Sequence, residues 1–315
     1  MPVDPNNDLI LITCASGKQG TDLLPHLTKT FRRLRLHCNS TISAQRLSSH
    51  YPNAEIIQAD LSNPSTAPSL LKDVTAVYLV APPLRSDEFS TITHFITSAA
   101  TQRRTTGRLQ HLIYSSVLHP TLSAMLHHDA KRRIEEFLIE TGTPHKADPA
   151  PLPYTIVQPS HVMEMFPIAE MVKADRPVYK VPYDPDTRFS WTSTKDLGEV
   201  VARLVREREG HFYATYQLVS SGVGSYRDAC KAVGRVLGRE VRIERVEVGV
   251  VAGGMAQGRG DVEERGKRML EYYDVRGLVG SRNVMRWLLG REPLSYEKWA
   301  EMRVQEIREE MARLG

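Results

Sequence analysis

The feature that most constrains this chain is a strand, a turn of small residues and a helical stretch, in that order, close to its start. Leu9–Ile12 is an uninterrupted apolar run typical of a buried strand. Gly17 and Gly20 follow in a turn, and leucines at helical spacing occupy Thr21–Leu27. Such a layout directs backbone N–H groups and a helix N-terminus at a phosphate. We therefore predict a dinucleotide-binding turn; a tight turn that binds no nucleotide is the alternative.

Position 14 departs from the pattern expected of such a turn. A first glycine belongs where the turn is tightest, and the chain has Cys14 there. Because a side chain resists positive φ, either the turn runs at negative φ or the phosphate loop is distorted. A thiolate is favoured at a helix N-terminus, so both a redox role and a space-filling role for Cys14 stay open.

Composition limits the class of protein. The chain has 315 residues, 41% of them hydrophobic, which suffices for one large domain or one and a half. The net charge of +4 and the absence of a long Lys/Arg run argue against a nucleic-acid partner. No apolar stretch is long enough for a membrane span, and no signal peptide is visible. Three scattered cysteines fit reduced thiols, so we expect a cytoplasmic protein. We also expect a monomer or homodimer.

Strands and helices are expected to alternate over the first 160 residues. The expected strands are Leu9–Ile12, Leu34–Cys38, Ala54–Gln58, Ala76–Ala81, His111–Ser115 and Tyr154–Gln158. The expected helices are Leu23–Leu34, Ser65–Lys72, Phe89–Thr101 and Ala130–Thr141. This alternation indicates an α/β protein with a parallel sheet covered on both faces, which binds ligands at the C-terminal ends of its strands. Four prolines in residues 142–153 predict an exposed insertion.

The pattern is less regular after Pro159. Residues 162–181 could hold one helix and a turn. Further expected helices are Thr194–Glu207, Ser225–Leu237 and Trp299–Leu314, and further expected strands are Tyr216–Val219 and Val241–Val248. The five glycines in Gly249–Gly260 predict a mobile segment or a lid. The Met and Trp side chains of the last helix are expected in the core.

Several segments, in order along the chain, match the pattern of a known family. They are Thr13–Gly20, Gln58–Leu61, Val77–Pro83, Leu112–Val117, Lys131–Leu138 with Tyr154–Pro159, and Tyr226–Ala229 ahead of Leu237–Arg239. On these segments the chain resembles the NmrA-like proteins, an atypical branch of the short-chain dehydrogenase/reductase superfamily. That family includes NADP-dependent reductases, such as the isoflavone reductase and quinone oxidoreductase types. It also includes nucleotide-sensing regulators that catalyse nothing known.

The resemblance implies a Rossmann-type, doubly wound parallel sheet with a small C-terminal α/β substrate-binding domain. Residues 1–160 would form the dinucleotide-binding domain, with the sheet completed by parts of residues 185–220. Residues 161–315 would mostly form the substrate-binding region.

The expected cofactor is NADP(H). Gly17, Lys18, Gln19 and Gly20 would face its pyrophosphate. NAD-binding proteins carry an acidic residue after the second strand, whereas this chain has Asn39 there and Arg46 a few residues on. The missing acid removes repulsion of a 2′-phosphate.

Two further segments are expected at the cofactor. The family pattern implies that Asp60 and Leu61 border the adenine, although Asp60 could equally be a helix N-cap. Ala81 and Pro82, with the following Pro83, would line the cofactor edge.

Reductases of the superfamily use a Tyr-x-x-x-Lys motif with a serine on the fifth strand. Lys131 matches the lysine, but His127 stands at the tyrosine position, and Ser115 or Ser116 fills the serine position. A histidine can act as an acid near neutral pH, so His127 could donate the proton; it could equally be a surface residue. Lys131 could likewise be a solvated lysine. We expect no metal site, because the adjacent His127, His128 and Asp129 point in different directions on a helix.

The expected substrate is a small hydrophobic molecule, aromatic or polyketide-like. Leu118, Val162, Met163, Met165 and Phe166 would line its pocket, an apolar and adaptable set. Three functions stay open: an NADP-dependent reductase or isomerase, a non-catalytic NADP(H) sensor that binds a protein partner, and an enzyme of this fold that does not use the nucleotide.

Overall fold

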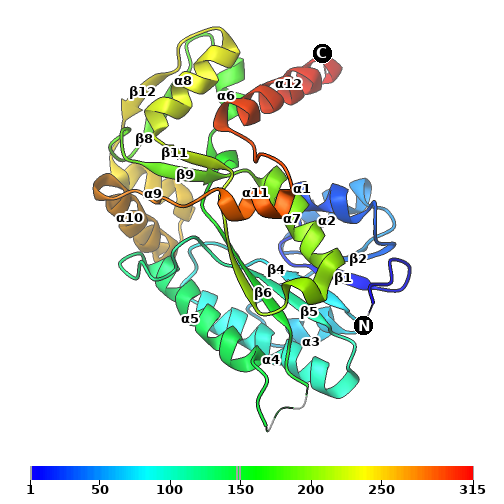
Figure 1. Ribbon diagram of the computed structural model, residues 1–315. Helices are drawn as coiled ribbons and strands as arrows, with labels where there is room; N and C mark the ends of the chain where they lie inside the picture. The colour runs from blue at the N-terminus through cyan, green and yellow to red at the C-terminus, as the bar shows by residue number, and fades with distance from the viewer. Residues whose placement is uncertain (1, 147, 149, 315) are drawn as a thin grey trace. The chain divides into compact units, whose positions relative to one another are not determined.

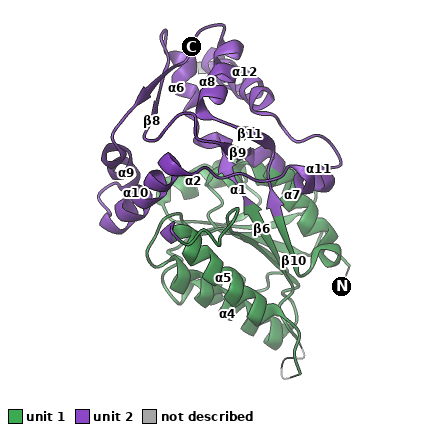
Figure 2. Cartoon of the chain, turned by 60° about the vertical axis from the view of Figure 1, so that its left-hand side comes forward, with its two compact units in different colours: residues 1–123, 127–158, 197–216 green, residues 124–126, 159–196, 217–315 purple. Residues whose placement is uncertain are grey.

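The computed structural model describes residues 2–146, 148 and 150–314 (Figure 1). The chain forms two compact units (Figure 2). Unit 1 comprises residues 1–123, 127–158 and 197–216, and unit 2 comprises residues 124–126, 159–196 and 217–315. Part of the predicted insertion, at positions 147 and 149, lies outside the described residues.

Unit 1 is built on a seven-stranded sheet with the order β10-β6-β5-β4-β1-β2-β3. Its strands are β1 (Leu9–Ile12), β2 (Arg33–Cys38), β3 (Glu55–Gln58), β4 (Ala76–Leu79), β5 (His111–Ser115), β6 (Tyr154–Pro159) and β10 (Ala214–Leu218). The β1–β2, β2–β3, β1–β4, β4–β5 and β5–β6 pairs all run parallel, which confirms the predicted α/β sheet. Because β1 pairs with both β2 and β4, the strand order reverses beside β1, where such sheets bind ligands.

Helices cover both faces of this sheet (Figure 1). They are α1 (Lys18–Leu27), α2 (Thr41–His50), α3 (Thr66–Leu71), α4 (Glu88–Thr106), α5 (Leu126–Gly142) and α7 (Thr194–Glu207). Helices α3, α4 and α5 share one apolar core with the strands, which includes Leu70, Ile92 and Ile134. On the other face α7 approaches α1 so closely that a Cβ on Gly198 would lie 2.6 Å from the Asp22 carbonyl oxygen.

Helices α4 and α5 are longer than predicted, and α1 and α2 differ most from the prediction. Helix α1 starts at Lys18 and ends at Leu27, not at Leu34, because β2 already begins at Arg33. Helix α2 was not predicted: it buries only Leu47, while Ile42 is 80% exposed, so it has no apolar periodicity to detect.

Unit 2 combines two small sheets with helices. One sheet has the order β11-β9-β7 and the other pairs β12 with β8. Its elements are β7 (His161–Val162), α6 (Ile168–Lys173), β8 (Val178–Val181), β9 (Phe189–Thr192), β11 (Ser221–Gly224), α8 (Tyr226–Leu237), β12 (Arg242–Arg245), α9 (Val248–Ala256), α10 (Gly260–Val275), α11 (Asn283–Leu289) and α12 (Tyr296–Leu314). Trp299 on α12 is fully buried, as predicted for the core, but the prediction is wrong for Met311 of the same helix, which is 44% exposed.

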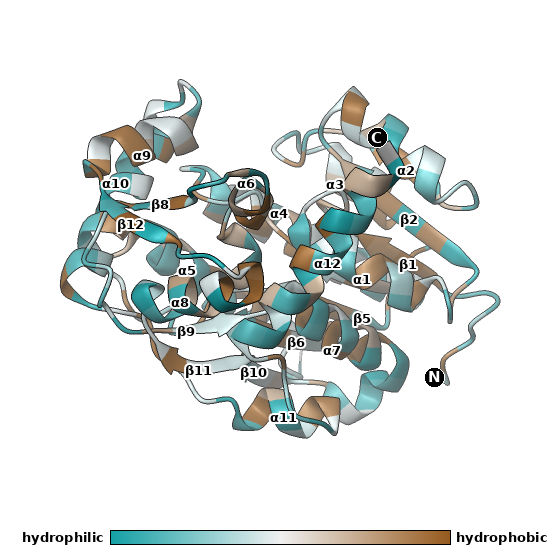
Figure 3. Cartoon of the chain, turned by 90° about the horizontal axis from the view of Figure 1, so that it is seen from above, coloured by the Kyte–Doolittle hydropathy of each residue, from teal (hydrophilic) through white to brown (hydrophobic). Residues whose placement is uncertain are grey.

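Most of the glycine-rich segment Gly249–Gly260, which the sequence predicts to be mobile or a lid, belongs to helix α9. Helix α9 is largely hydrophobic in colour (Figure 3) and packs against α10. A Cβ on Gly266 of α10 would lie only 3.6 Å from the Met255 sulfur and 3.9 Å from Ala252. These are ordinary packing distances, and a Cβ on Gly249 or Gly254 of α9 would meet no atom within 4 Å, so the contact with α10 involves Ala252 and Met255 and not the glycines of α9.

Candidate functional site

The loop after β1 adopts the left-handed turn that a dinucleotide-binding loop uses, even though it carries a cysteine. Cys14 has a φ of 49°, so the turn neither runs at negative φ nor loses its tight bend. The Cys14 N–H donates to His37 Nδ1 at 3.2 Å, and the Ala15 N–H donates to the His37 carbonyl oxygen at 2.8 Å. These bonds to β2 hold a conformation that is otherwise unfavourable for a side-chain-bearing residue.

The ring of His37 supports the loop as a neutral imidazole. Its Nε2 lies 3.0 Å from the Ala59 carbonyl oxygen and must donate to it, which leaves Nδ1 as the acceptor for Cys14. Burial lowers the pKa of His37, which favours this neutral form.

Thr13 and Gly20 fix the two ends of the loop. The Thr13 hydroxyl donates to the Val80 carbonyl oxygen at 2.8 Å and accepts from the Val80 N–H at 2.7 Å. A Cβ on Gly20 would lie 2.2 Å from the Ala15 carbonyl oxygen, so only glycine fits where α1 crosses the loop. At the exposed Gly17 a Cβ would lie 3.2 Å from the Cys14 carbonyl oxygen, so a larger side chain there would project over the loop.

The N-terminus of α1 is open to an anion. Gly17 is its N-cap residue, so no side chain caps the helix, and its first turn holds no acidic residue. The backbone N–H groups of Lys18, Gln19 and Gly20 belong to the first turn, where no preceding helical carbonyl oxygen accepts from them. The residue Lys18 is exposed beside them. A negative group would be stabilised here by these N–H groups and by the helix dipole.

Arg46 lies against the same loop. From helix α2 it donates through Nη2 to the Ser16 carbonyl oxygen at 2.5 Å, and the residue is exposed. Asn39 at the end of β2 is also exposed, and Ser40 caps α2 by accepting from the Ser43 N–H. The exposed guanidinium is thus held beside the turn that sequence reasoning assigned to the pyrophosphate.

The side chain of Gln19 is directed into unit 1. Its carboxamide oxygen accepts from the Tyr78 hydroxyl at 2.5 Å and from the Ser115 hydroxyl at 2.9 Å. Burial raises the pKa of Tyr78, so that phenol keeps the proton it donates. The first turn of α1 is therefore tied to both β4 and β5, and Ser115 is held in a defined orientation.

The remaining predicted cofactor residues lie at the ends of β3 and β4. Asp60 is exposed and accepts from the Ser62 N–H at 2.9 Å, and this bond is the main reason that its pKa is lowered. It thus closes a local turn, whereas Ser65 stands at the N-cap of α3. Leu61 and Ala81 are buried, and Pro82 is half-buried.

Lys131 is held by a carboxylate that sequence reasoning did not identify. Its ammonium lies 2.7 Å from Oε1 of Glu88 on α4, and the two side chains are only 13% and 1% exposed. The ammonium also lies 5.6 Å from the centre of the Tyr114 ring. A buried acid at the start of a helix has no distinguishing sequence pattern, because acids are common at exposed helix N-termini.

A second buried carboxylate follows one helical turn later. Both oxygens of Glu135 accept from the Gln158 side-chain nitrogen, at 2.9 and 3.0 Å. Burial raises the pKa of Glu135, while the Lys131 charge acts in the opposite direction. The i, i+4 spacing from Lys131 was the available signal for this residue.

The two histidines at the start of α5 are both buried. Their rings meet edge to face with centres 4.5 Å apart. His128 contacts the His119 carbonyl oxygen through Nδ1 at 3.0 Å, and burial lowers its pKa to about 4. The alternative in which His127 is a surface residue is therefore wrong, because its exposed fraction is 9%.

The predicted substrate-pocket residues differ in exposure. Leu118 in unit 1 and Met163 in unit 2 are fully buried, and Met165 is 52% exposed. Phe166 stacks on Tyr179 with ring centres 4.7 Å apart, and Val162 is half-buried. Phe166 is thus already part of an aromatic cluster in unit 2.

Cys14 does not have the properties of a redox thiol. Burial raises its pKa to about 12, so the group stays protonated at neutral pH despite its place before a helix. Within residues 2–146, 148 and 150–314, no group of three or more His, Cys, Asp and Glu side chains could hold a metal ion. None of the helices described is both long and apolar enough to cross a membrane.

Solved structures show a similar arrangement. The fold is similar to that of the NADPH-dependent quinone oxidoreductase QOR2 from Escherichia coli, solved with NADPH, with a TM-score of 0.73 and 18% identity over 93% of this chain and 99% of that one. The triphenylmethane reductase of Citrobacter sp., solved with NADP(H), gives a TM-score of 0.72 and 16% identity over 94% and 99% of the two chains. NmrA, a negative transcriptional regulator solved with NADP, gives a TM-score of 0.71 and 18% identity over 94% of each chain.

At these identities the solved structures establish the fold alone. No curated protein matches the chain in sequence. The family model of the NmrA-like family, however, matches residues 6–280, nearly the whole chain. This chain therefore belongs to the NmrA-like family.

Proposed function

We propose that this protein is an NADP(H)-dependent oxidoreductase that acts on a small hydrophobic molecule. The observation that carries the proposal is the loop after β1, in which Cys14 keeps the left-handed turn, Gly20 allows the close crossing, and the N-terminus of α1 is uncapped. Three solved structures of similar fold contain NADPH or NADP.

The residues present fit this cofactor. The first-turn N–H groups of α1 would hold the diphosphate. Arg46, exposed beside the loop, would hold the 2′-phosphate through its planar guanidinium. The β2 end brings no carboxylate that would repel this phosphate.

The bound cofactor would supply a hydride. Lys131 would hold a ribose hydroxyl, as the family lysine does, and would have to share its ammonium with Glu88. Ser115, oriented by Gln19, would donate a hydrogen bond to an oxygen of the substrate only after releasing that partner. His127 would supply the proton that the missing tyrosine supplies elsewhere. Leu118, Val162, Met163 and Phe166 remain predicted contacts for the apolar part of the substrate, but only Val162 keeps part of its surface exposed, because the other three are buried.

The second candidate is an NADP(H)-sensing protein without catalysis. The ion pair between Lys131 and Glu88 favours it, because the lysine is neutralised by a residue of the chain itself. The absence of tyrosine at position 127 points the same way. An isomerase or cyclase that does not use the nucleotide is the third.

Calorimetric titration with NADPH and NADH tests the cofactor. We expect NADPH to bind with a micromolar dissociation constant, which corresponds to a binding free energy of about 8 kcal/mol. NADPH should also bind more tightly than NADH does. Gly17→Val should abolish binding, because the side chain would occupy the loop surface. Gly210→Val is the matched control, since a Cβ there meets no atom within 4 Å. If the wild type binds neither nucleotide, the proposal is wrong and the nucleotide-independent enzyme is favoured.

Turnover separates the two nucleotide-binding candidates. The reductase should oxidise NADPH in the presence of quinones, enones or triphenylmethane dyes, whereas the sensor should bind NADPH without oxidising it.

A further inference from the structure

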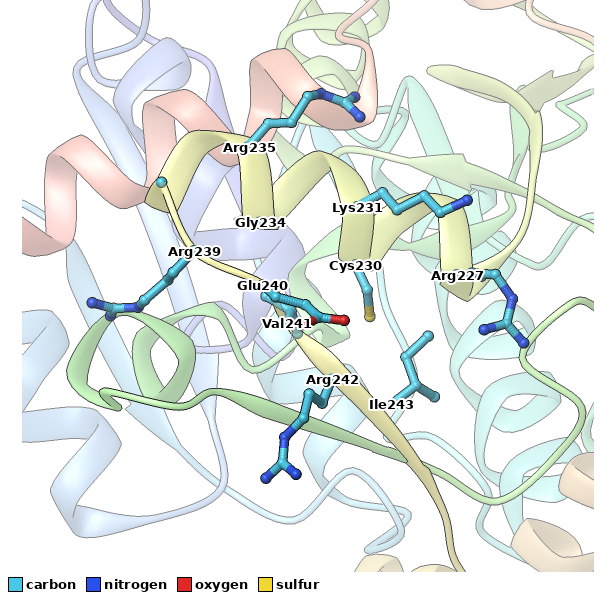
Figure 4. A pocket seen from close by; sticks show the side chains of 11 residues that line it. Arg227, Cys230, Lys231, Gly234, Arg235, Arg239, Glu240, Val241, Arg242 and Ile243 are labelled. Atoms are coloured by element: carbon cyan, nitrogen blue, oxygen red, sulfur yellow. The ribbon is translucent and has the colours of Figure 1, made fainter.

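Unit 2 contains a cavity of about 760 Å³ whose lining is unusually basic (Figure 4). It lies between helix α8 and the segment that leads into β12. Five of its lining residues are cationic and only Glu240 is anionic; the cations are Arg227, Lys231, Arg235, Arg239 and Arg242. The volume falls in the usual range for small-molecule sites, which is roughly 300–1,000 Å³.

The local fold explains why these charges gather. Arg227, Lys231 and Arg235 follow one another at i, i+4 and i+8, so they line one face of α8. The chain then turns back at Gly238, whose φ is +71°, and brings Arg239 and Arg242 to the same cavity. A Cβ on Gly234 would lie 3.0 Å from the Arg239 carbonyl oxygen, so this glycine permits the close return.

The positive charge is only partly neutralised. Arg227 pairs with Asp186 and Arg235 with Glu297, but these side chains are 45–60% exposed, and such pairs contribute little. Neither Lys231 nor Arg242 forms an ion pair or a side-chain hydrogen bond with any part of the chain that the structure describes. An anion at these two cations would therefore displace no carboxylate.

Arg239 adds a buried donor. Its Nη2 donates to the carbonyl oxygens of Met171 and Val172 at 3.1 and 2.7 Å. Its Nε is buried and has no partner among the described residues. Those carbonyls carry no net charge, and Glu240 is the one carboxylate among the residues that line the cavity, while Asp186 outside the lining also lies within the field of Lys231.

A thiol and a carboxylate also face the cavity. Cys230 and Glu240 extend into the space between α8 and β12 (Figure 4). Burial raises the pKa of the Cys230 thiol to about 12, so it adds no negative charge. A second cavity of about 740 Å³ on α10 offers a contrast, because its Lys267 and Arg268 already pair with acids one turn away.

We propose that this cavity binds a small molecule bearing at least two phosphate charges, at a site separate from the loop after β1. Planar guanidinium groups match phosphate geometry, and a flexible lysine adds a mobile point charge. Glu240 limits the affinity, because it is the one anionic group that faces the ligand.

Titration of the full-length protein with inorganic pyrophosphate tests the proposal. Lys231→Ala and Arg242→Ala should each weaken binding by about tenfold or more, since each removes a charge-assisted contact. Glu240→Gln should tighten binding, an effect that local disruption would not produce. Lys267→Ala, at an exposed lysine already paired with Glu271, is the matched control and should leave binding unchanged.

The outcomes distinguish the sites and the ligand sources. Binding that persists in Gly17→Val supports a separate site, whereas its loss there assigns pyrophosphate to the loop after β1 and overturns the proposal. The proposal is also overturned if Lys231→Ala and Arg242→Ala bind pyrophosphate as tightly as the wild type does. It is overturned as well if the wild type does not bind pyrophosphate. Tighter binding of a doubly phosphorylated peptide than of pyrophosphate would replace the small molecule with a protein partner.

Discussion

Removing Lys131 should destabilise unit 1 far more than removing an ordinary surface lysine. The ammonium lies 2.7 Å from Glu88, whose side chain is 1% exposed and whose second oxygen is buried with no partner in the described part of the chain. Lys131→Met would leave this carboxylate without a cation. Breaking a buried pair from one side costs about 3–5 kcal/mol, because the remaining charge is uncompensated.

The matched comparison is the more exposed pair between Lys195 and Glu306, which is 2.8 Å long and whose side chains are 27% and 41% exposed. Lys195→Met should cost at most about 1 kcal/mol. Adding Glu88→Gln to Lys131→Met should recover most of the loss, because it removes the stranded charge. The two single substitutions and the double substitution form a cycle that measures the pair directly.

Urea unfolding followed by far-ultraviolet circular dichroism is the suitable assay. All three tryptophans, Trp191, Trp287 and Trp299, lie in unit 2, whereas far-ultraviolet circular dichroism follows the secondary structure of both units. A cost for Lys131→Met no larger than that for Lys195→Met would refute the reasoning. So would a double variant less stable than Lys131→Met alone.

Three further outcomes follow from the site and the core. Arg46→Ala should narrow the preference for NADPH over NADH in calorimetry, because the exposed guanidinium beside Ser16 is the proposed 2′-phosphate contact; an unchanged preference contradicts this. Cys14 should react with iodoacetamide at pH 8 roughly a thousandfold more slowly than an unperturbed thiol, because its pKa of about 12 leaves very little thiolate. Labelling at the rate of an unperturbed thiol would show that burial does not keep the thiol protonated. Burial lowers the pKa of His111 to about 3, whereas the unfolded chain protonates this residue near pH 6.5. Between these two pH values the unfolded state therefore binds more protons than the folded state, and the free energy of unfolding decreases as the pH falls. The loss at pH 5 should be about 2 kcal/mol in urea unfolding, and His111→Gln, which keeps a donor for Thr155, should remove most of it; a variant with the same pH dependence as the wild type would contradict the assignment.

Apolar runs predicted the sheet well because burial on both faces leaves a strong signal. The expected His111–Ser115 strand has the observed bounds of β5, and the amphipathic Thr194–Glu207 helix has those of α7. Elements held by other forces left no such signal. Helix α2 is mostly exposed, and α9 is a glycine-rich helix that packs against α10.

The contacts of the candidate site residues could not be predicted from the sequence. Gly17 and Gly20 lie in the expected turn and at the start of α1, and Lys131 lies on α5, while the roles of all three stay predictions. Their partners come from distant parts of the chain: Glu88 is 43 residues from Lys131, and Ser115 is 96 residues from Gln19. Sequence spacing within one helix reveals neighbours one turn apart, whereas partners on other elements depend on tertiary packing.

The attachments of the loop after β1 affect the thermodynamics of any ligand that it binds. Thr13 is bonded to β4, Ala15 to β2, and Gln19 to β4 and β5, so the loop is ordered by the fold itself. Its conformational entropy is lost when the chain folds and need not be lost again on association. A diphosphate would then meet donors that are already oriented, and a large part of the contact energy would remain as affinity.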